Sequence, residues 1–203
     1  MATIRNNNPT FLTLLAFWNK HCKIDESHIH WLKMNIELIE HLPKGKTVYI
    51  EGDRQKSLYF VSRGILARIR YDDKFKIHIL SLAFPAMALM STSHLYSNTA
   101  SPGNIIALHA NTSIIKISYS SIKETRQSIP EVATLISILN NKKKKQLLQL
   151  RILTSIKNPI ERYLYFSEHL QEIKNALTHK EVAQLLGIST NSIFRASIKW
   201  RNR

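Results

Sequence analysis

Apolar residues in the first 42 positions recur every three or four residues, which is the spacing of an amphipathic helix. Two such runs predict two helices within residues 10–42, and Asp25 or Ser27 is placed to cap the second. Pro43 ends this helical stretch, because proline disfavours helical backbone in the residue before it. The apolar positions are Phe11, Leu14, Leu15 and Trp18 in the first run and Ile29, Leu32, Ile36 and Ile39 in the second.

The pattern changes to short β-rich runs between residues 43 and 118. Turn-forming pairs, among them Arg63-Gly64 and Asp72-Asp73, separate these runs. Several short strands at this spacing are typical of an antiparallel barrel or sandwich. The predicted strands cover residues 47–51, 57–62, 65–71, 76–82, 105–110 and 113–118.

Residues 119–154 return to helical spacing. From Pro130 onward one stripe alternates between steps of four and three residues, which favours a coiled-coil-like seam over an amphipathic helix packed on its own domain. Asn158 and Pro159 then begin another helix, predicted over residues 160–173. The seam would consist of Val132, Ile136, Leu139, Lys143, Gln146, Leu150 and Leu153.

Charge adds a candidate partner to this outline. The 203 residues include 29 Lys and Arg against 14 Asp and Glu, a formal net charge of +15. Residues 142–203 alone hold 13 of the basic residues and 4 of the acidic ones. Such an excess favours a polyanionic partner, and its position directs attention to the last third of the chain.

Cysteine usage and hydropathy restrict the class of protein. Cys22 is the one cysteine, so an internal disulfide and a four-cysteine metal or iron–sulfur site are excluded. The apolar stretch at residues 11–18 is too short to cross a bilayer, and the polar start of the chain is not a signal peptide. We therefore expect a soluble, cytoplasmic protein without a membrane partner.

The most informative stretch is residues 178–199, THKEVAQLLGISTNSIFRASIK. Thr178 and Glu181 form a capping-box pattern that begins a helix, and Gly187 permits a left-handed turn at its end. Ser189 is placed to cap a second helix that runs to about Trp200. Two short helices joined by a glycine-containing turn predict a helix-turn-helix, and we favour DNA binding over a structural helical hairpin.

The outer face of the second helix carries the candidate contacts with DNA. Thr190, Asn191 and Arg195 are predicted to read base edges, since Asn pairs well with adenine and Arg with guanine in the major groove. A second set is predicted to contact phosphates, which positions the protein without specifying sequence. This set comprises Thr178, His179, Lys180, Ser189, Ser192 and Lys199.

Across residues 30–203 the chain resembles the Crp/Fnr family of transcription regulators. Gly45, Gly52 and Gly64 match the glycine pattern of that family's β-roll, and IERYLYF at 160–166 is similar to the start of its DNA-binding domain. The resemblance implies an α+β fold: an antiparallel β-roll (double-stranded β-helix) with flanking helices, a long dimerisation helix and a C-terminal winged helix-turn-helix. The corresponding domains are 1–129, 130–156 and 157–203, with Thr190, Asn191 and Arg195 on the family's base-reading positions.

One stretch departs from the family pattern. Residues 84–110 occupy the place of the phosphate-binding cassette of cyclic-AMP-binding members, yet they contain no Glu and no Arg. A cyclic phosphate needs a cation, and its ribose needs a hydrogen-bond acceptor. We therefore expect no cyclic-AMP binding of the usual kind and no cofactor. Another effector, if it binds, is predicted to contact Phe84, Met87, Met90, Ser101 and Asn104.

Other chemistry is not indicated. His78, His94 and His109 are interpreted as separate histidines rather than a metal site, and no catalytic motif is present, so we expect no enzyme. The resulting hypothesis is a sequence-specific regulator that binds double-stranded DNA as a homodimer, with RNA polymerase as a further partner. The alternative is a β-roll that senses a small molecule or binds a protein and carries a vestigial helix-turn-helix.

Overall fold

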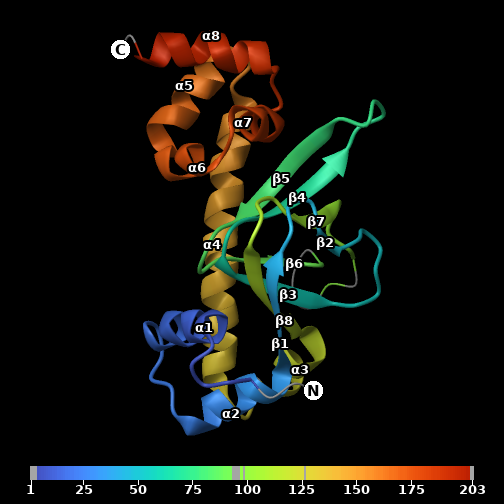
Figure 1. The fold of residues 1–203 in the computed structure, drawn as a ribbon, viewed down its shortest axis with the longest axis vertical. Helices are drawn as coiled ribbons and strands as arrows, with labels where there is room; N and C mark the ends of the chain where they lie inside the picture. The colour runs from blue at the N-terminus through green and yellow to red at the C-terminus, as the bar shows by residue number, and fades with distance from the viewer. Residues whose placement is uncertain (1–3, 93–96, 98, 126, 202–203) are drawn as a thin grey trace. The chain divides into compact units, whose positions relative to one another are not determined.

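The computed structural model describes residues 4–92, 97, 99–125 and 127–201. The chain separates into two compact units (Figure 1). The N-terminal unit consists of Met1–Arg68 and Leu82–Lys144, and the C-terminal unit of Ile69–Ser81 and Lys145–Arg203.

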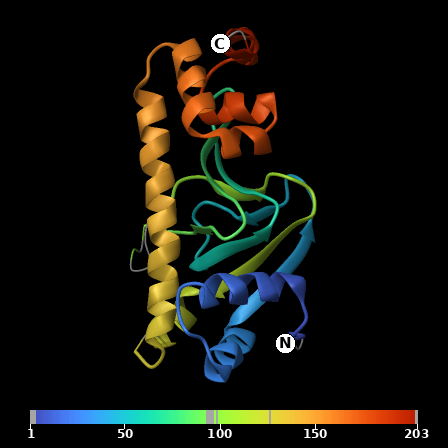
Figure 2. The same ribbon diagram turned by 90° about the vertical axis from the view of Figure 1, so that its left-hand side faces the viewer.

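Two helices open the N-terminal unit, as the apolar spacing predicts. Helix α1 (Pro9–Asn19) begins where Asn8 accepts a hydrogen bond from the Phe11 amide at 2.9 Å. Helix α2 (Glu26–Asn35) is capped by Asp25, whose side chain accepts from the Ser27 and His28 amides. Figure 2 shows both helices, in blue, next to the strands of the same unit.

The second predicted helix is wrong beyond residue 35, because residues Ile36–Leu42 form strand β1. This strand pairs antiparallel with β8 (Thr112–Ser118), and the register places Ile36 opposite Ile117 and Leu38 opposite Ile115. β-Branched residues pack well on a pleated surface, and here the partner strand lies some 80 residues away in the sequence. The long-range pairing overrides the local helical spacing.

Eight strands of the described residues form two four-stranded sheets. The first has the order β1-β8-β3-β6 and the second β2-β7-β4-β5. The pairs β1–β8, β3–β8, β3–β6 and β2–β7 are antiparallel, which confirms the predicted antiparallel β-roll. The remaining strands are β2 (Thr47–Tyr49), β3 (Ser57–Arg63), β4 (Leu66–Tyr71), β5 (Ile77–Ala83), β6 (Ala88–Met90) and β7 (Asn104–Ala107).

The turn between β3 and β4 requires glycine. Gly64 has φ +79°, and a Cβ atom built there would lie 2.4 Å from Thr112 Oγ1 and 2.9 Å from Thr112 Cα. A side chain would therefore collide with the backbone of β8 as well as adopt a strained conformation. This explains physically why one glycine of the β-roll pattern stands at residue 64.

Helices α3 (Tyr119–Thr125) and α4 (Pro130–Ser155) follow the sheets. Within the N-terminal unit, the start of α4 packs Val132, Ile136 and Leu139 into one core with Trp18 and Phe60. Further along α4, Gln146, Leu150 and Leu153 are also buried. Apart from the half-buried Lys143, the residues of the predicted stripe are therefore buried within a single chain, which corrects the preference for a coiled-coil-like seam over a packed amphipathic helix.

Four helices make up most of the C-terminal unit: α5 (Pro159–His169), α6 (Gln171–Ala176), α7 (His179–Leu186) and α8 (Thr190–Arg201). The predicted cap at Asn158 is confirmed, since its side chain accepts from the Ile160 amide at 2.9 Å. The helix predicted over 160–173 is instead two, because the buried Leu170 leaves helical backbone (φ −132°, ψ 44°). Residues 127–201 contain no strand, so the predicted wing is not seen among these described residues.

Candidate nucleic-acid interface

Helix α7 begins at the capping box that its sequence predicts. The Glu181 amide donates to Thr178 Oγ1 at 3.3 Å, and the Thr178 amide donates to Glu181 Oε2 at 2.9 Å. Each side chain thus satisfies an amide that the first helical turn leaves without a partner. The carboxylate also lies at the positive end of the helix dipole, which stabilises its charge.

The turn between α7 and α8 is made by Gly187 and Ser189. Gly187 adopts left-handed backbone at φ +64° and ψ 35°, and the Ile188 amide donates to the Ala183 carbonyl at 3.1 Å. The Ser192 amide then donates to Ser189 Oγ at 3.1 Å, which caps α8 as predicted. These local bonds fix where α8 begins and in which direction it leaves the turn.

Helix α8 has one buried face and one exposed face. Ile193, Ala196 and Ser197 are buried, and α8 packs against α5 and α7 through this side. Figure 1 shows α8, in red, lying across the other helices of its unit. The opposite face of α8 is consequently free to meet a partner.

The structure places all three predicted base-reading residues on the exposed face. Thr190, Asn191 and Arg195 are exposed, and they lie within the first two turns of α8. Arg195 carries a planar guanidinium that suits bidentate recognition of a guanine edge. Their reading of bases is a prediction that this placement permits.

The predicted phosphate contacts divide into two groups. His179, Lys180 and Lys199 are exposed at the start of α7 and near the end of α8. The hydroxyl groups of Thr178, Ser189 and Ser192 are engaged in the two caps, with Ser189 Oγ and Ser192 Oγ 2.9 Å apart. These three side chains therefore have a structural task beside any phosphate contact.

Arg162 on α5 was missed by the sequence reasoning. Its Nη1 donates to the Leu186 carbonyl at 2.7 Å, at the end of α7. Its Nε and Nη2 donate to the Ile156 carbonyl at 2.9 and 2.7 Å. One guanidinium therefore ties the end of α7 to the segment between α4 and α5, and no local pattern around residue 162 signals these partners.

The five residues predicted to contact an effector are not brought together as a group. Met90 belongs to the core beneath α1, whereas Met87 packs against a second core with Leu89 and Ile105. Phe84 and Asn104 are half-buried, and Asn104 Oδ1 accepts from the Glu51 amide at 2.9 Å. Met90 and Ser101 do share a partner, which is Arg68 on β4. The effector pocket stays a prediction.

Arg68 supplies the cation that residues 84–110 lack. Arg68 is 4% exposed, and its guanidinium donates to the carbonyls of Met90, Ser101, Pro102 and Gly103, at 3.4 to 3.5 Å for the last three. Burial lowers the pKa of Arg68, and burial together with Arg68 lowers the pKa of Lys143 on α4 to about 8. Residues 84–110 themselves hold no Arg, and the guanidinium that meets them from β4 is bound by backbone carbonyls.

The described part of the chain contains neither a cluster of metal-ligating side chains nor a membrane-spanning helix. No three His, Cys, Asp or Glu side chains there lie close enough to hold a metal ion. His78 pairs with Asp72 at 2.9 Å, and His94 lies outside the described residues. None of the helices in residues 4–92, 97, 99–125 and 127–201 is both long and apolar enough to span a membrane.

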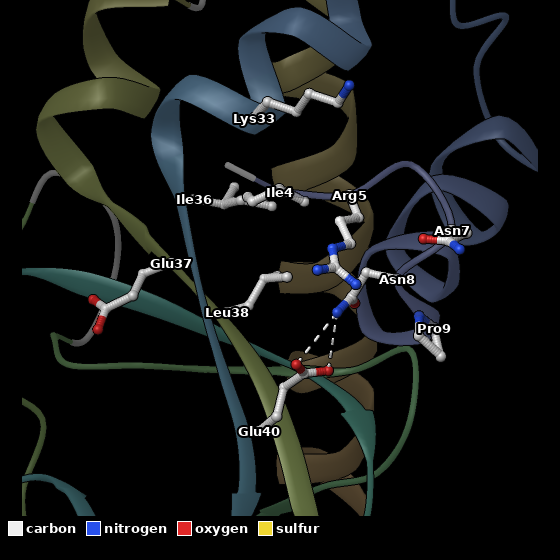
Figure 3. Close-up of a pocket in the computed structure, with 10 residues that line it drawn as sticks. All are labelled: Ile4, Arg5, Asn7, Asn8, Pro9, Lys33, Ile36, Glu37, Leu38 and Glu40. Carbon is white, nitrogen blue, oxygen red and sulfur yellow. Dashed lines mark hydrogen bonds between the residues drawn. The ribbon is translucent and has the colours of Figure 1, made fainter. Parts of the chain in front are cut away.

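A groove of about 840 Å³ lies beside β1 in the N-terminal unit (Figure 3). Glu40 accepts hydrogen bonds from Asn8 Nδ2 at 3.3 Å and from Thr10 Oγ1 at 2.6 Å. Arg5 and Lys33 share the lining with Glu37 and Glu40, so both signs of charge are present. None of the predicted effector-contacting residues is in this lining.

No known protein-family profile and no curated protein sequence matches the chain. Solved structures do match. They include the c-di-GMP-responsive global regulator CLP of Xanthomonas campestris (16% identity, 88% of this chain and 92% of that one, TM-score 0.67). They also include a Crp/Fnr-family transcriptional regulator from Eubacterium rectale (16%, 93% and 87%, TM-score 0.67) and a mutant CooA from Carboxydothermus hydrogenoformans (14%, 98% and 88%, TM-score 0.68). The predicted fold, that of the Crp/Fnr regulators, is thereby confirmed.

Proposed function

We propose that this chain is a sequence-specific regulator of transcription that binds double-stranded DNA and inserts α8 into the major groove. The observation that carries the proposal is the helix pair α7–α8. A capping box, a left-handed glycine and a second cap hold α8 by its buried face, while Thr190, Asn191 and Arg195 face solvent. This is the arrangement of a recognition helix, whose N-terminal residues contact base edges.

The charge around α8 supports a polyanionic partner. Residues 190–201 contain Arg195, Lys199 and Arg201 and no acidic residue. Lys180 and His179 are exposed at the start of the preceding helix. Each Lys or Arg that neutralises a phosphate releases counterions, so affinity for DNA should fall steeply with salt.

The proposed regulator acts as a homodimer through an outward face of α4. Leu148 is 59% exposed and Ile152 is 41% exposed, and they lie four residues apart on one side of the helix. Pairing these side chains would remove apolar surface from water. We expect Leu148→Glu to shift sedimentation from dimer towards monomer, whereas Leu12→Glu, at an exposed leucine of α1, should leave the dimer intact.

The proposal includes the cellular setting expected from the sequence: a cytoplasmic, non-enzymatic protein with RNA polymerase as a further partner. Cyclic AMP is not the proposed effector, since residues 84–110 contain no Glu and no Arg. Arg68 is the cation that meets this stretch, and its hydrogen bonds go to the chain's own carbonyls. Calorimetry with cyclic AMP should therefore record no heat of binding.

The test is selection of duplexes from a random-sequence library by the full-length protein, followed by fluorescence anisotropy at two salt concentrations. Arg195→Ala should cost about 1–3 kcal/mol on the enriched duplex and relax one base position. Lys180→Ala should weaken binding to all duplexes alike and flatten the dependence on salt. Equal loss on every sequence for Arg195→Ala would remove its base-reading role. Absence of binding to any duplex would favour the alternative with a vestigial helix-turn-helix.

A further inference from the structure

Helix α8 exposes two large apolar side chains that the base-reading and phosphate assignments leave unexplained. Phe194 is 61% exposed and Ile198 is 45% exposed. They lie four residues apart, so they are neighbours on the helix surface. Meanwhile Ile193 and Ala196 already supply the buried side of α8. Phe194 and Ile198 are therefore surplus to packing within the chain.

The two apolar residues lie among the predicted base-reading side chains. Asn191, Phe194, Arg195 and Ile198 follow the spacing i, i+3, i+4 and i+7, which places them along one stripe of the helix. At 1.5 Å per residue this stripe is about 10 Å long. That length corresponds to about three base pairs at 3.4 Å per step. The stripe thus offers polar and apolar groups to successive base pairs.

The chemistry of this stripe selects its occupant. A surface with Arg195, Lys199 and Arg201 and without acidic residues attracts a polyanion, while Phe194 and Ile198 require an apolar group on that polyanion. The C5-methyl group of thymine is such a group, and it projects into the major groove of duplex DNA. An anionic bilayer fits less well, because Asn191 and Arg195 interrupt the apolar surface that an interfacial helix needs.

We propose that Phe194 and Ile198 recognise thymine methyl groups, so that the DNA half-site carries thymine beside the base that Arg195 reads. This inference rests on the proposed function of α8 as a recognition helix. It adds an apolar component of specificity to the polar contacts. It also assigns a role to the two side chains of α8 whose exposure is otherwise unfavourable in water.

The test removes the methyl group and nothing else. In the duplex enriched by the wild-type protein, each thymine is replaced in turn by deoxyuridine, and affinity is measured by anisotropy. Loss of one contacted methyl group should weaken wild-type binding about three- to fourfold. Phe194→Ala should bind the thymine and deoxyuridine duplexes equally at the position that Phe194 contacts. Phe75→Ala, at an 87% exposed phenylalanine outside the helix-turn-helix, should keep the wild-type difference.

The outcomes separate this inference from the function on which it rests. Sequence-selective binding with equal affinity for thymine and deoxyuridine at every position would overturn methyl recognition and leave the proposed regulator intact. Enrichment of sites without thymine would also overturn methyl recognition and leave the proposed regulator intact. Binding without any sequence preference would remove both proposals. Phe194-dependent binding to phosphatidylglycerol vesicles, with no methyl effect on DNA, would assign the apolar stripe to a membrane and overturn the inference.

Discussion

Arg68 and Arg195 place the same guanidinium group in opposite surroundings. Arg68 is buried inside the β-roll and donates to the chain's own carbonyls, whereas Arg195 is exposed on α8. Only a cation that remains accessible can neutralise a phosphate or reach a base edge. A net charge of +15 therefore indicates a polyanionic partner without saying which cations contact it. Burial and hydrogen bonding determine which cations remain accessible.

The largest expected effect concerns Arg68, the buried one of the two arginines. Arg68→Met keeps much of the side-chain volume but leaves the carbonyls of Met90 and Ser101–Gly103 without their donor. Each buried acceptor left unsatisfied is costly, so the free energy of unfolding should fall by about 2–4 kcal/mol. Urea unfolding measures the loss. Arg70→Met on the exposed side of β4 is the control, and equal stability of the two variants would show that Arg68 is not a structural clamp.

The second effect concerns Arg162, which supports the helix pair that carries the exposed Arg195. Arg162→Met removes the donors to the Ile156 and Leu186 carbonyls and should lower the free energy of unfolding by about 2 kcal/mol. Because Leu186 ends α7, the affinity for the enriched duplex should fall as well. Arg151→Met, at an exposed arginine of α4, provides the control for loss of charge. Full DNA affinity in Arg162→Met would mean that α7 and α8 hold their geometry without this tie.

The range of an interaction along the chain decides whether the sequence predicts it. The caps at Thr178 and Ser189 and the turn at Gly187 are local, since each depends on residues within a few positions, and all three are confirmed. The partners of Arg68 and Arg162 lie between 6 and 35 residues away, and no spacing rule reports them. Strand β1 was mistaken for helix for the same reason.

The sequence also did not predict which face of α4 packs into the core. An apolar stripe is required both for packing inward and for pairing outward, and the sequence does not say which of two stripes does which. Val132, Ile136 and Leu139 turn into the core, while Leu148 and Ile152 remain exposed. Within the N-terminal unit, packing against the sheets and α1 decides that the first three turn into the core. The existence of the helix was predictable from local spacing, and its orientation was not.

A smaller effect probes the turn that aims α8. Gly187→Ala should lower the free energy of unfolding by about 1 kcal/mol, because alanine is strained at φ +64°. The position is otherwise open, since the added Cβ would find Arg162 Nη1 only at 4.0 Å. Gly187→Asn should cost less, as asparagine tolerates left-handed backbone. Thermal unfolding ranks the three proteins, and a larger loss for Asn than for Ala would contradict a purely conformational cost.

The smallest effect tests a second buried cation of the N-terminal unit. His28 is 6% exposed, with Nδ1 2.6 Å from Asp25 Oδ1 and Nε2 3.2 Å from Glu131 Oε2. Burial opposes protonation, but the hydrogen bond to Asp25 and the ion pair with Glu131 outweigh it and raise the pKa of His28 above its usual value. Hydrogen bonds from Ser27 and His28 lower the pKa of Asp25, and bonds to its own amide and to His28 lower that of Glu131. Both partners therefore stay ionised while His28 titrates.

A raised pKa in the folded state contributes stability that is complete below about pH 6.5, the unperturbed value, and disappears as pH rises through the raised pKa. The difference in unfolding free energy between the wild type and His28→Gln should consequently be largest near pH 6 and shrink towards pH 9. His30→Gln, at an exposed histidine of the same helix, should show no such trend. A difference that stays constant or widens with pH would mean that His28 acts here as a neutral packing group beside Trp18 and not, like Arg68, as a buried cation held by the chain itself.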